Sequence, residues 1–352
     1  MTKKTSIRNN LLADLLLDNF RVKPSLFGLS VFVISSIIGY FYHLQTFPNV
    51  NTPNEILQYV TSWLWNLVYI PVMAYYFLWI PTQSDKLTES LLLSDTIDVS
   101  PDEIEIGVKF RNSRFRFVML WAGGLVLVLL TYITRSISPY WFDFSTFKLI
   151  LFMIAFFIGG YIVTDMASTL IINVIVLNKA FSGKNIMLKP LHPDGCGGFK
   201  FILDYSIGVT YLAAVTGFLI GITEYKFIVQ KLTDDYWYFH LIIPIYLIGA
   251  IISFFTPLNS AHKAMASSKN KLLLAISKQY EQEYKLAQDA LINKSLDLKI
   301  TTDKLKEIEE FYKMTEKFPV WPFQYRNIKG FYLSIISPIL PLVIGIIKDI
   351  LV

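Results

Sequence analysis

The chain has 352 residues, of which 53% are hydrophobic, 15% aromatic and only 17% charged, and its formal net charge is +5. Soluble domains carry about 25% charged residues, and the apolar residues here gather into runs of about 20, the length that crosses a bilayer. An ordinary soluble class is excluded, nucleic-acid binding is not expected, and the single cysteine excludes an intramolecular disulfide and a multi-cysteine zinc site.

The first 24 residues combine basic side chains with one short apolar pattern. In residues 10–20, NLLADLLLDNF, one face of a helix would carry Leu12, Leu15, Leu16 and Phe20. Beside basic flanks, such a face is typical of a helix that lies in a membrane interface. We predict an interfacial helix within residues 1–24; the alternative is a soluble helix packed on the loops of the same side.

Seven apolar runs are long enough to cross a bilayer. A hydrocarbon core offers backbone polar groups no water, so continuous runs of this kind are expected to be helices. The fourth run exceeds the bilayer thickness, which predicts a tilt or an extension beyond the membrane. The last contains Pro338 and Pro341 and is either a span or a re-entrant segment. We predict an all-α polytopic membrane protein, a bundle of six to seven transmembrane helices over residues 25–44, 56–80, 115–134, 147–177, 203–223, 238–255 and 331–352.

The distribution of Lys and Arg along the connections gives an orientation. Connections rich in these residues stay in the cytoplasm, and this is true of the N-terminal leader, of residues 81–114 and 178–202, and of residues 256–330. The N-terminus is therefore predicted to be cytoplasmic, and the C-terminus to be outside if the last run spans. We expect a multi-pass protein of a bacterial inner membrane.

Two of the cytoplasmic connections contain strand patterns. In residues 104–110, IEIGVKF, the apolar residues Ile104, Ile106, Val108 and Phe110 alternate with other residues, and residues 185–189 show a shorter alternation. A period of two is typical of a strand with one buried face. We therefore expect a small cytoplasmic sheet beside the bundle.

Residues 258–317 differ from the six-span bundle of residues 25–257, because their apolar positions recur at spacings of three and four between charged ones. This spacing predicts amphipathic helices with a coiled-coil-like seam. We predict a cytoplasmic helical hairpin, which is either a solvated connection or a stalk for homo-oligomerisation or for a protein partner. The predicted seam comprises Leu273, Ile276, Tyr280, Tyr284, Ala287 and Leu291 in the first helix and Leu305, Ile308 and Tyr312 in the second.

An aromatic stretch, FPVWPF, follows the hairpin at residues 318–323. Its prolines end the preceding helix, and its aromatic rings, with Arg326 and Lys329 nearby, suit the headgroup level of a membrane. Residues 318–352 are therefore predicted to form a membrane-surface anchor and the last span.

Two predicted spans carry a polar stripe at helical spacing. Two such stripes would line a polar path through the bundle, although Ser, Thr, Asn and Gln also hydrogen-bond to one another inside ordinary membrane bundles. Pro71, which follows the stripe of the second span, is an expected kink. The stripe of the fourth span comprises Tyr161, Asp165, Ser168, Thr169 and Asn173, and that of the second span comprises Gln58, Ser62, Asn66 and Tyr69.

Asp165 has the strongest claim to function among the residues of the spans. Ionisable side chains within a membrane are costly and often functional, and no cation in the sequence is an evident partner for this carboxyl group. Burial would then favour its neutral form. A secondary transporter is a weaker interpretation, because the sequence shows neither an internal repeat nor matching interrupted helices.

The connection between the fourth and fifth spans contains LHPDGCGGF, residues 191–199. Its first interpretation is a tight turn, because Pro-Asp-Gly is a strong turn signature. The second is an anion or lipid-headgroup site on the backbone amides of the Gly-rich loop. A metal or catalytic use of Cys196 with its neighbours is the weakest, because no further ligands are evident. The residues of the possible anion loop are Lys189, His192, Asp194, Gly195, Gly197, Gly198 and Lys200.

No Walker A loop, HExxH, GxSxG or CxxC motif occurs, so an enzyme is not the leading expectation and no cofactor or metal is predicted. The leading hypothesis is a channel-like or membrane-effector component whose polar stripes line a path. The alternative is a non-catalytic scaffold or assembly subunit that docks a partner through residues 258–317. A secondary transporter or a lipid-acting membrane enzyme comes third.

Overall fold

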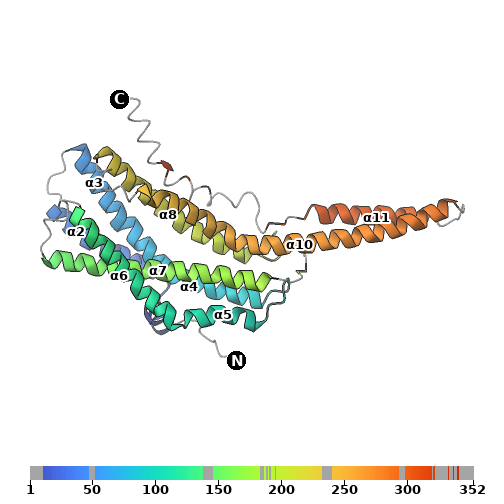
Figure 1. Cartoon of the computed structure of the whole chain (residues 1–352), viewed down its shortest axis with the longest axis horizontal. Helices are drawn as coiled ribbons and strands as arrows, with labels where there is room; N and C mark the ends of the chain where they lie inside the picture. Colours follow the sequence, from blue (N-terminus) through green and yellow to red (C-terminus); the bar gives the residue numbers. More distant parts are fainter. Residues whose placement is uncertain are drawn as a thin grey trace.

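The computed structural model folds the chain into a helical bundle with one long helical extension (Figure 1). It describes residues 11–321 apart from 47–51, 138–145, 183–185, 188, 190–191, 195, 232–239, 293–297 and 319, and beyond residue 321 only positions 332, 336, 339 and 340. Every longer regular element in the described part is a helix, which confirms the all-α class. The elements are α1 (Leu11–Asp14), η1 (Leu15–Asn19), α2 (Pro24–Thr46), α3 (Pro53–Leu64), η2 (Trp65–Tyr69), α4 (Ile70–Leu92), α5 (Pro101–Arg111), α6 (Arg114–Ile137), α7 (Thr146–Phe181), α8 (Lys200–Val229), α10 (Ile242–Ile292) and α11 (Leu298–Glu316).

Six helical stretches among the described residues are long and apolar enough to cross a membrane, and they match the first six predicted spans. The seventh predicted span, residues 331–352, lies almost entirely outside the described residues. The six stretches are Pro24–Tyr42, Glu55–Leu92, Arg114–Ile133, Leu149–Phe181, Lys200–Val229 and Ile243–Ile292.

The second stretch runs without interruption through α3, η2 and α4. It begins at a capping box, in which Glu55 N–H donates to Thr52 Oγ1 at 3.3 Å and Thr52 N–H donates to Glu55 Oε2 at 3.0 Å. A π-helical turn, Trp65–Tyr69, lies directly before Pro71. Proline has no backbone N–H to complete the helical ladder, and a widened turn is a common way to absorb that loss. The π-turn is the irregularity that the structure shows next to Pro71, and the kink expected there stays a prediction.

Helices α6 and α7 pack at very close range through three glycines. A Cβ atom added at Gly160 would lie 2.6 Å from the carbonyl oxygen of Gly123 and 3.0 Å from Cα of Gly124. Small residues at such positions let the backbones of membrane helices approach each other. The same contact fixes the register, because Gly123 and Gly160 lie at one level of the antiparallel pair.

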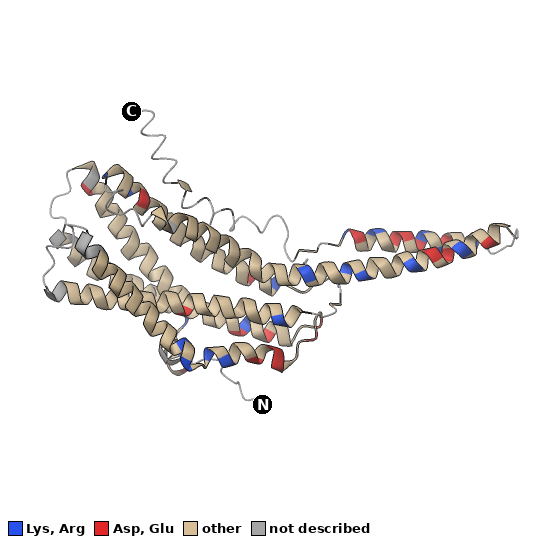
Figure 2. Ribbon diagram, viewed as in Figure 1, with Lys and Arg blue, Asp and Glu red and all other residues tan. Residues whose placement is uncertain are grey.

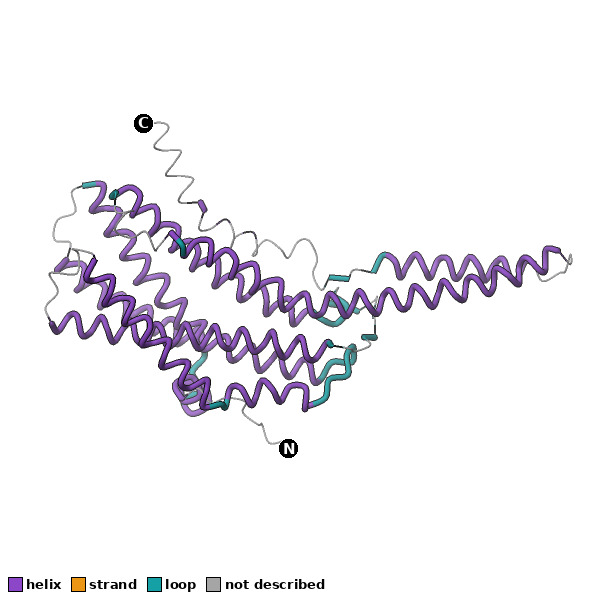
Figure 3. Tube along the Cα trace, in the orientation of Figure 1, coloured by secondary structure: helices purple, strands orange, loops and turns teal. Residues whose placement is uncertain are grey.

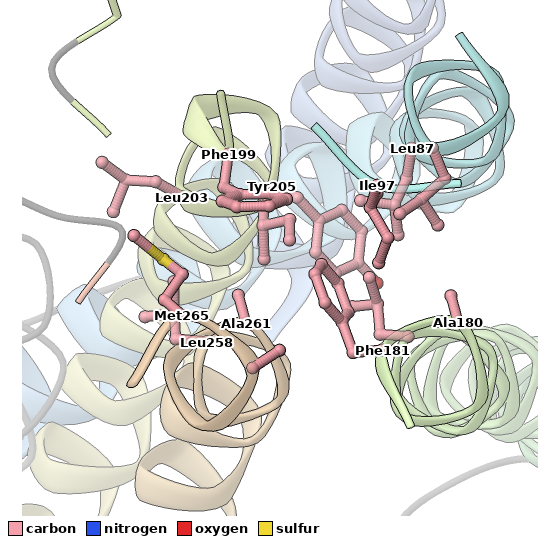
Figure 4. Packing of buried hydrophobic residues seen from close by; sticks show 14 of the residues in the cluster. Leu87, Ile97, Ala180, Phe181, Phe199, Leu203, Tyr205, Leu258, Ala261 and Met265 are labelled. Carbon is pink, nitrogen blue, oxygen red and sulfur yellow. The ribbon is translucent and has the colours of Figure 1, made fainter. Parts of the chain in front are cut away.

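The two ends of the bundle differ in how they bury apolar side chains. On α2, α6 and the first half of α7 many large apolar residues are exposed, as expected for surfaces that face lipid. We call the other end, where α5 and the α10–α11 pair lie, the hairpin end. There α4, α5, α7, α8 and α10 enclose a continuous core around Leu177, Phe199, Leu203 and Leu258 (Figure 4). Lys, Arg, Asp and Glu concentrate at this end and along the extension, as Figure 2 shows.

The strand predicted for residues 104–110 is wrong, because the structure places these residues in α5 (Figure 3). Pro101 occupies the first turn, and Glu103 Oε2 accepts the Ser100 N–H at 2.9 Å, so the sequence starts a helix here. Ile104, Gly107 and Arg111 are buried against the bundle at spacings of three and four. Among residues 185–189, the described positions 186, 187 and 189 are not in a strand either.

Helix α10 has 51 residues and continues from a candidate span into the extension, where α11 packs against it in the opposite direction (Figure 1). Lys269 Nζ on α10 donates to the carbonyl oxygen of Phe318, just after α11, at 3.0 Å, and Glu283 lies 4.0 Å from Lys304. The predicted hairpin is therefore present; its position in the cytoplasm stays a prediction. Of its predicted seam, Ile276 and Ala287 are buried, whereas Leu291 is exposed.

The aromatic stretch after the hairpin packs on protein at its described positions. Phe318 is buried in the core of the hairpin end, and Trp321 stacks on His262 of α10 with ring centroids 3.9 Å apart. His262 Nδ1 also lies 3.1 Å from the Val320 carbonyl oxygen. These contacts tie the end of α11 to α10, and a contact with membrane headgroups stays a prediction.

Candidate functional site

Asp165 forms a buried ion pair with Arg116 of α6, through Nη2 and Oδ1. The side chains are only 3% and 6% exposed, respectively. The expectation that this carboxyl group has no cationic partner is therefore wrong. The argument for a neutral Asp165 depended on that missing partner, so it loses its premise.

Residues of α7 hold the ion pair on both sides. Arg116 Nη2 donates a second hydrogen bond to Thr169 Oγ1 at 3.1 Å, one helical turn beyond Asp165. Thr169 Oγ1 and Ser168 Oγ each donate to the Asp165 backbone carbonyl at 2.9 Å. The predicted polar face of the fourth span thus binds the guanidinium group of Arg116 through Asp165 and Thr169.

A second buried arginine, Arg111 at the end of α5, continues the cluster toward the hairpin end. Its Nη2 donates to Asn173 Oδ1 at 2.9 Å and also to Ser84 Oγ of α4, and its Nη1 lies 3.5 Å from Asp85 Oδ1. Asn173 Nδ2 donates to the Tyr205 hydroxyl of α8 at 2.8 Å. Together with the pair above, these bonds connect five helices: α4, α5, α6, α7 and α8. We call this set the arginine cluster.

The arginine cluster lies at the boundary between the two ends of the bundle. Arg116 is the third residue of α6, whose following residues expose apolar side chains. On α7, 19 residues separate Asp165 from the first helical residue, Thr146, which is about 28 Å of helix and about one bilayer core. The remainder of α7 packs in the core of the hairpin end. Helix α7 is therefore longer than a bilayer requires, and its extension beyond the membrane stays a prediction.

The polar stripe of the second span lies at a different level. Asn66 Nδ2 donates to the Ser62 carbonyl within its own helix at 3.0 Å, and Trp65 Nε1 donates to Thr223 Oγ1 of α8 at 3.0 Å. Eighteen residues separate Asn66 from Ser84 on the same rod, or about 27 Å. Gln58 and Tyr161 are half-buried. The stripes are therefore stacked end to end rather than facing each other, and a continuous path stays a prediction.

Sequence reasoning missed both arginines and one carboxylate. Arg111 counts in the sequence as one of the charges of the 81–114 connection, and Arg116 falls at the start of the predicted span 115–134 without standing out, although the two lie five residues apart across a short corner. Glu224, which directly follows the predicted span 203–223, is buried within α8, and one of its carboxylate oxygens contacts His240 Nδ1. The available signal for Glu224 was its position directly after an apolar run that a helix could extend.

The loop LHPDGCGGF folds around the carboxylate of Asp194. The Cys196 amide donates to Oδ1 at 2.8 Å, the Gly198 amide donates to Oδ2 at 3.0 Å, and the Lys200 amide donates to Oδ2 at 3.2 Å. Lys200 is the first residue of α8, so the loop supplies its own anion to a helix N-terminus. These are amides that an external anion would use. The geometry favours the turn interpretation, while anion binding stays a prediction.

Two glycines of this loop have conformations that other residues rarely adopt. Gly197 and Gly198 have φ values of 65° and 93°, and a Cβ atom at Gly198 would lie 2.4 Å from Thr96 Oγ1. Gly195 lies outside the described residues. Lys189 pairs with Asp95 at 3.0 Å and lowers the pKa of that carboxyl group, so it is engaged within the loops.

The remaining side chains of the loop give little support to catalysis. His192 Nδ1 lies 2.6 Å from Asp194 Oδ1. Burial, and then the nearby carboxylates of Asp194 and Asp204, raise the pKa of the Cys196 thiol to about 11, so the reactive thiolate is scarce at neutral pH. Within the described residues, no group of three or more His, Cys, Asp or Glu side chains is arranged to hold a metal ion.

Replacing Asp194 by asparagine is expected to cost about 1 kcal/mol of stability, as for the loss of a helix cap. Burial alone would raise the pKa of Asp194, but amide hydrogen bonds from Cys196 and Gly198, then His192, then the Lys200 amide, outweigh it and lower the pKa. The carboxylate therefore stabilises the fold above its unfolded pKa of about 3.9, and this contribution is lost as pH falls through the lower folded pKa. Unfolding in detergent, followed by circular dichroism against pH, measures it.

Asp204→Asn, at an exposed position in the second turn of α8, is the matched control for this experiment. The acid-side loss of stability should become shallower in Asp194→Asn and stay unchanged in Asp204→Asn. Equal pH profiles for wild type and Asp194→Asn would contradict the capping role.

Comparison with known proteins adds no relative: no family model matches the sequence, and neither a curated protein nor a solved structure matches the chain. The six apolar helices are compatible with a membrane protein. The arginine cluster and the hairpin are the features of the structure that bear on a more specific function.

Proposed function

We propose that the chain is a multi-pass membrane effector that opens a path for ions, and that the structure is its closed form. The observation that carries this proposal is the buried Arg116–Asp165 pair at the inner end of the apolar zone. Ionisable groups at membrane depth are rare and mark ion pathways more often than other positions do. Here the two charged groups bind each other, which holds α6 against α7 in the closed form.

The cluster has the form of a two-state element. Arg111 and Arg116 stand on either side of the sharp corner between α5 and α6 and both hold α7. If they release α7, Asp165, Thr169 and Asn173 lose their bonds to the two guanidinium groups together and need water or ions in place of those groups. The buried groups thus make the closed state all-or-none, because a half-satisfied cluster is costly.

The hairpin provides a lever for a signal. Helix α10 is one rod whose middle residues, Leu258, Ala261 and Met265, belong to the core that also holds Val176 and Leu177 of α7. A force on the hairpin would therefore reach α7 about one turn from Asn173. The lysine-rich composition of the hairpin and leader supports a cytoplasmic position for both, in a bacterial inner membrane.

Ion flux from reconstituted vesicles tests the proposal. Asp165→Asn removes the charge that holds Arg116, and we expect flux per protein to rise at least about tenfold, because losing a buried pair shifts an equilibrium by more than 1.4 kcal/mol. Glu105→Gln, which removes the exposed pair with Lys109, is the control and should not change the flux. Flux that stays at the wild-type level in Asp165→Asn, at equal protein content, would contradict the proposal.

A scaffold is the second candidate, favoured by apolar side chains exposed on the hairpin, among them Leu274, Leu286 and Leu291. The same vesicles and a co-purification distinguish the two functions. A scaffold loses a co-purifying partner when Leu273, Tyr280 or Tyr284 is replaced, and shows no flux with Asp165→Asn. A secondary transporter or a lipid-acting enzyme gains no support from the geometry of the 191–199 loop.

A further inference from the structure

The N-terminal segment, α1 and η1, is apolar on two sides. On one side Ala13 is buried against Phe77 and Leu78 of α4, with Leu16 and Leu17 packed beside it. This face is satisfied by the bundle. Its helical form is fixed in part by backbone hydrogen bonds from Phe20 N–H to Leu15 and from Val22 N–H to Leu16.

The other side of the segment is exposed. Leu12, Leu15 and Phe20 are 45%, 41% and 66% exposed, although they are the residues whose burial would be most favourable. The sequence pattern placed Leu16 on this face as well, but Leu16 turns toward the bundle. Directly after this face come Arg21 and Lys23, both exposed, with Arg21 in a left-handed conformation (φ 52°) that starts the turn into α2.

The position of the segment along the bundle indicates the environment of its exposed side. The apolar outer surface of α2 begins at Pro24, immediately after the segment. Ile162 of α7 packs on the cluster of Ala13, Phe77 and Leu78, and it lies three residues before Asp165. Arg116, the partner of Asp165, lies where the exposed apolar surface of α6 begins. Arg114, also exposed, is the first residue of α6. The segment thus lies at the level where the exposed apolar surfaces of α2 and α6 end and exposed basic residues begin.

We infer that Leu12, Leu15 and Phe20 insert into the bilayer on the hairpin side and that Arg21, Lys23 and Arg114 select lipids with anionic phosphate headgroups. Apolar side chains beside basic ones, at the edge of a hydrocarbon layer, are the arrangement that binds anionic membranes. Asp18, exposed on the same segment, offsets one of the positive charges. The preference for anionic over zwitterionic lipid is therefore expected to be about thirtyfold, the effect of two net basic residues.

Fluorescence quenching by brominated lipids tests this surface in the full-length protein. A cysteine-reactive dye is attached in the variant Leu15→Cys; the native Cys196 is buried and scarcely ionised, so it is not labelled. The labelled protein is reconstituted in mixtures of phosphatidylcholine and phosphatidylglycerol with one or the other brominated. The control site is Leu274→Cys, exposed on the hairpin beyond the core of the hairpin end.

Strong quenching at position 15, none at position 274, and an about thirtyfold preference for brominated phosphatidylglycerol support the inference. In the double variant Arg21→Gln and Lys23→Gln the preference should fall to about one, while quenching itself persists. The inference is overturned if position 15 is not quenched by either lipid, which means that protein or solvent covers it, or if both lipids quench it equally in the wild-type background. These readings do not depend on ion flux, so they stand or fall apart from the proposed function.

Discussion

Replacing Arg116 by methionine is expected to lower the free energy of unfolding by about 3–5 kcal/mol, the cost of leaving one partner of a buried ion pair alone. Asp165 is almost completely buried and receives its charge-assisted bond from this guanidinium. Methionine fills a similar length but donates nothing, so the carboxyl group must stay charged without a partner or take up a proton. Denaturant unfolding of the purified protein in detergent measures the loss.

A second substitution distinguishes the ion pair from simple loss of packing. Combining Arg116→Met with Asp165→Leu removes both charges, and a buried pair replaced by apolar side chains is often neutral in stability. The double variant should therefore recover most of the loss. Lys109→Met, on the exposed surface of α5, is the control and should change little. If Arg116→Met costs no more than Lys109→Met, the ion pair does not hold the bundle.

Gly160→Val is expected to cost about 3 kcal/mol or more, or to prevent accumulation of folded protein, because it forces α6 and α7 apart. The added Cβ atom meets the backbone of Gly123 and Gly124, which cannot rotate away as a side chain can. Overpacking of this kind costs about 1–3 kcal/mol when side chains can adjust. We therefore expect a clash with backbone atoms to lower the free energy of unfolding by about 3 kcal/mol or more. The yield and unfolding midpoint of the detergent-purified protein give the result.

The neighbouring glycine provides a matched control. A Cβ atom at Gly159 would find only one atom within 4 Å, a Leu127 methyl at 3.9 Å, so Gly159→Val should be tolerated. The two variants differ by one helix position and share the same chemistry. Similar losses in both would show that valine at this depth, and not the close approach of the helices, is responsible.

The candidate spans could be predicted from sequence because bilayer thickness sets their length and composition. The secondary structure of residues 104–110 could not, because alternation and helical spacing compete there. Ile104 is buried while Ile106 and Phe110 are partly exposed, so the helix buries a different set of residues from the predicted strand. The residues that favour a helix start, Ser100, Pro101 and Glu103, indicated the helix correctly.

Half of the candidate site was visible in the sequence. The stripe on α7 follows from spacings of three and four along one helix, so Asp165, Thr169 and Asn173 could be grouped. Their partners Arg111 and Arg116 come from a corner between two other helices, and the depth of that corner is set by tertiary packing. The role of Asp194 is likewise set by the folded loop. Its carboxylate accepts hydrogen bonds from the backbone amides that, judged from the sequence alone, could bind an external anion.

The most direct test of the proposal that the Arg116–Asp165 ion pair holds the path closed is an exchange of the two charged residues. Asp165→Arg combined with Arg116→Asp places the same two groups at the same two positions in exchanged order. The account predicts that Asp165→Asn raises ion flux from vesicles at least about tenfold, and that the exchanged pair returns flux to near the wild-type level. An exchanged pair that leaks as much as Asp165→Asn, or an Asp165→Asn variant as tight as wild type, would contradict it.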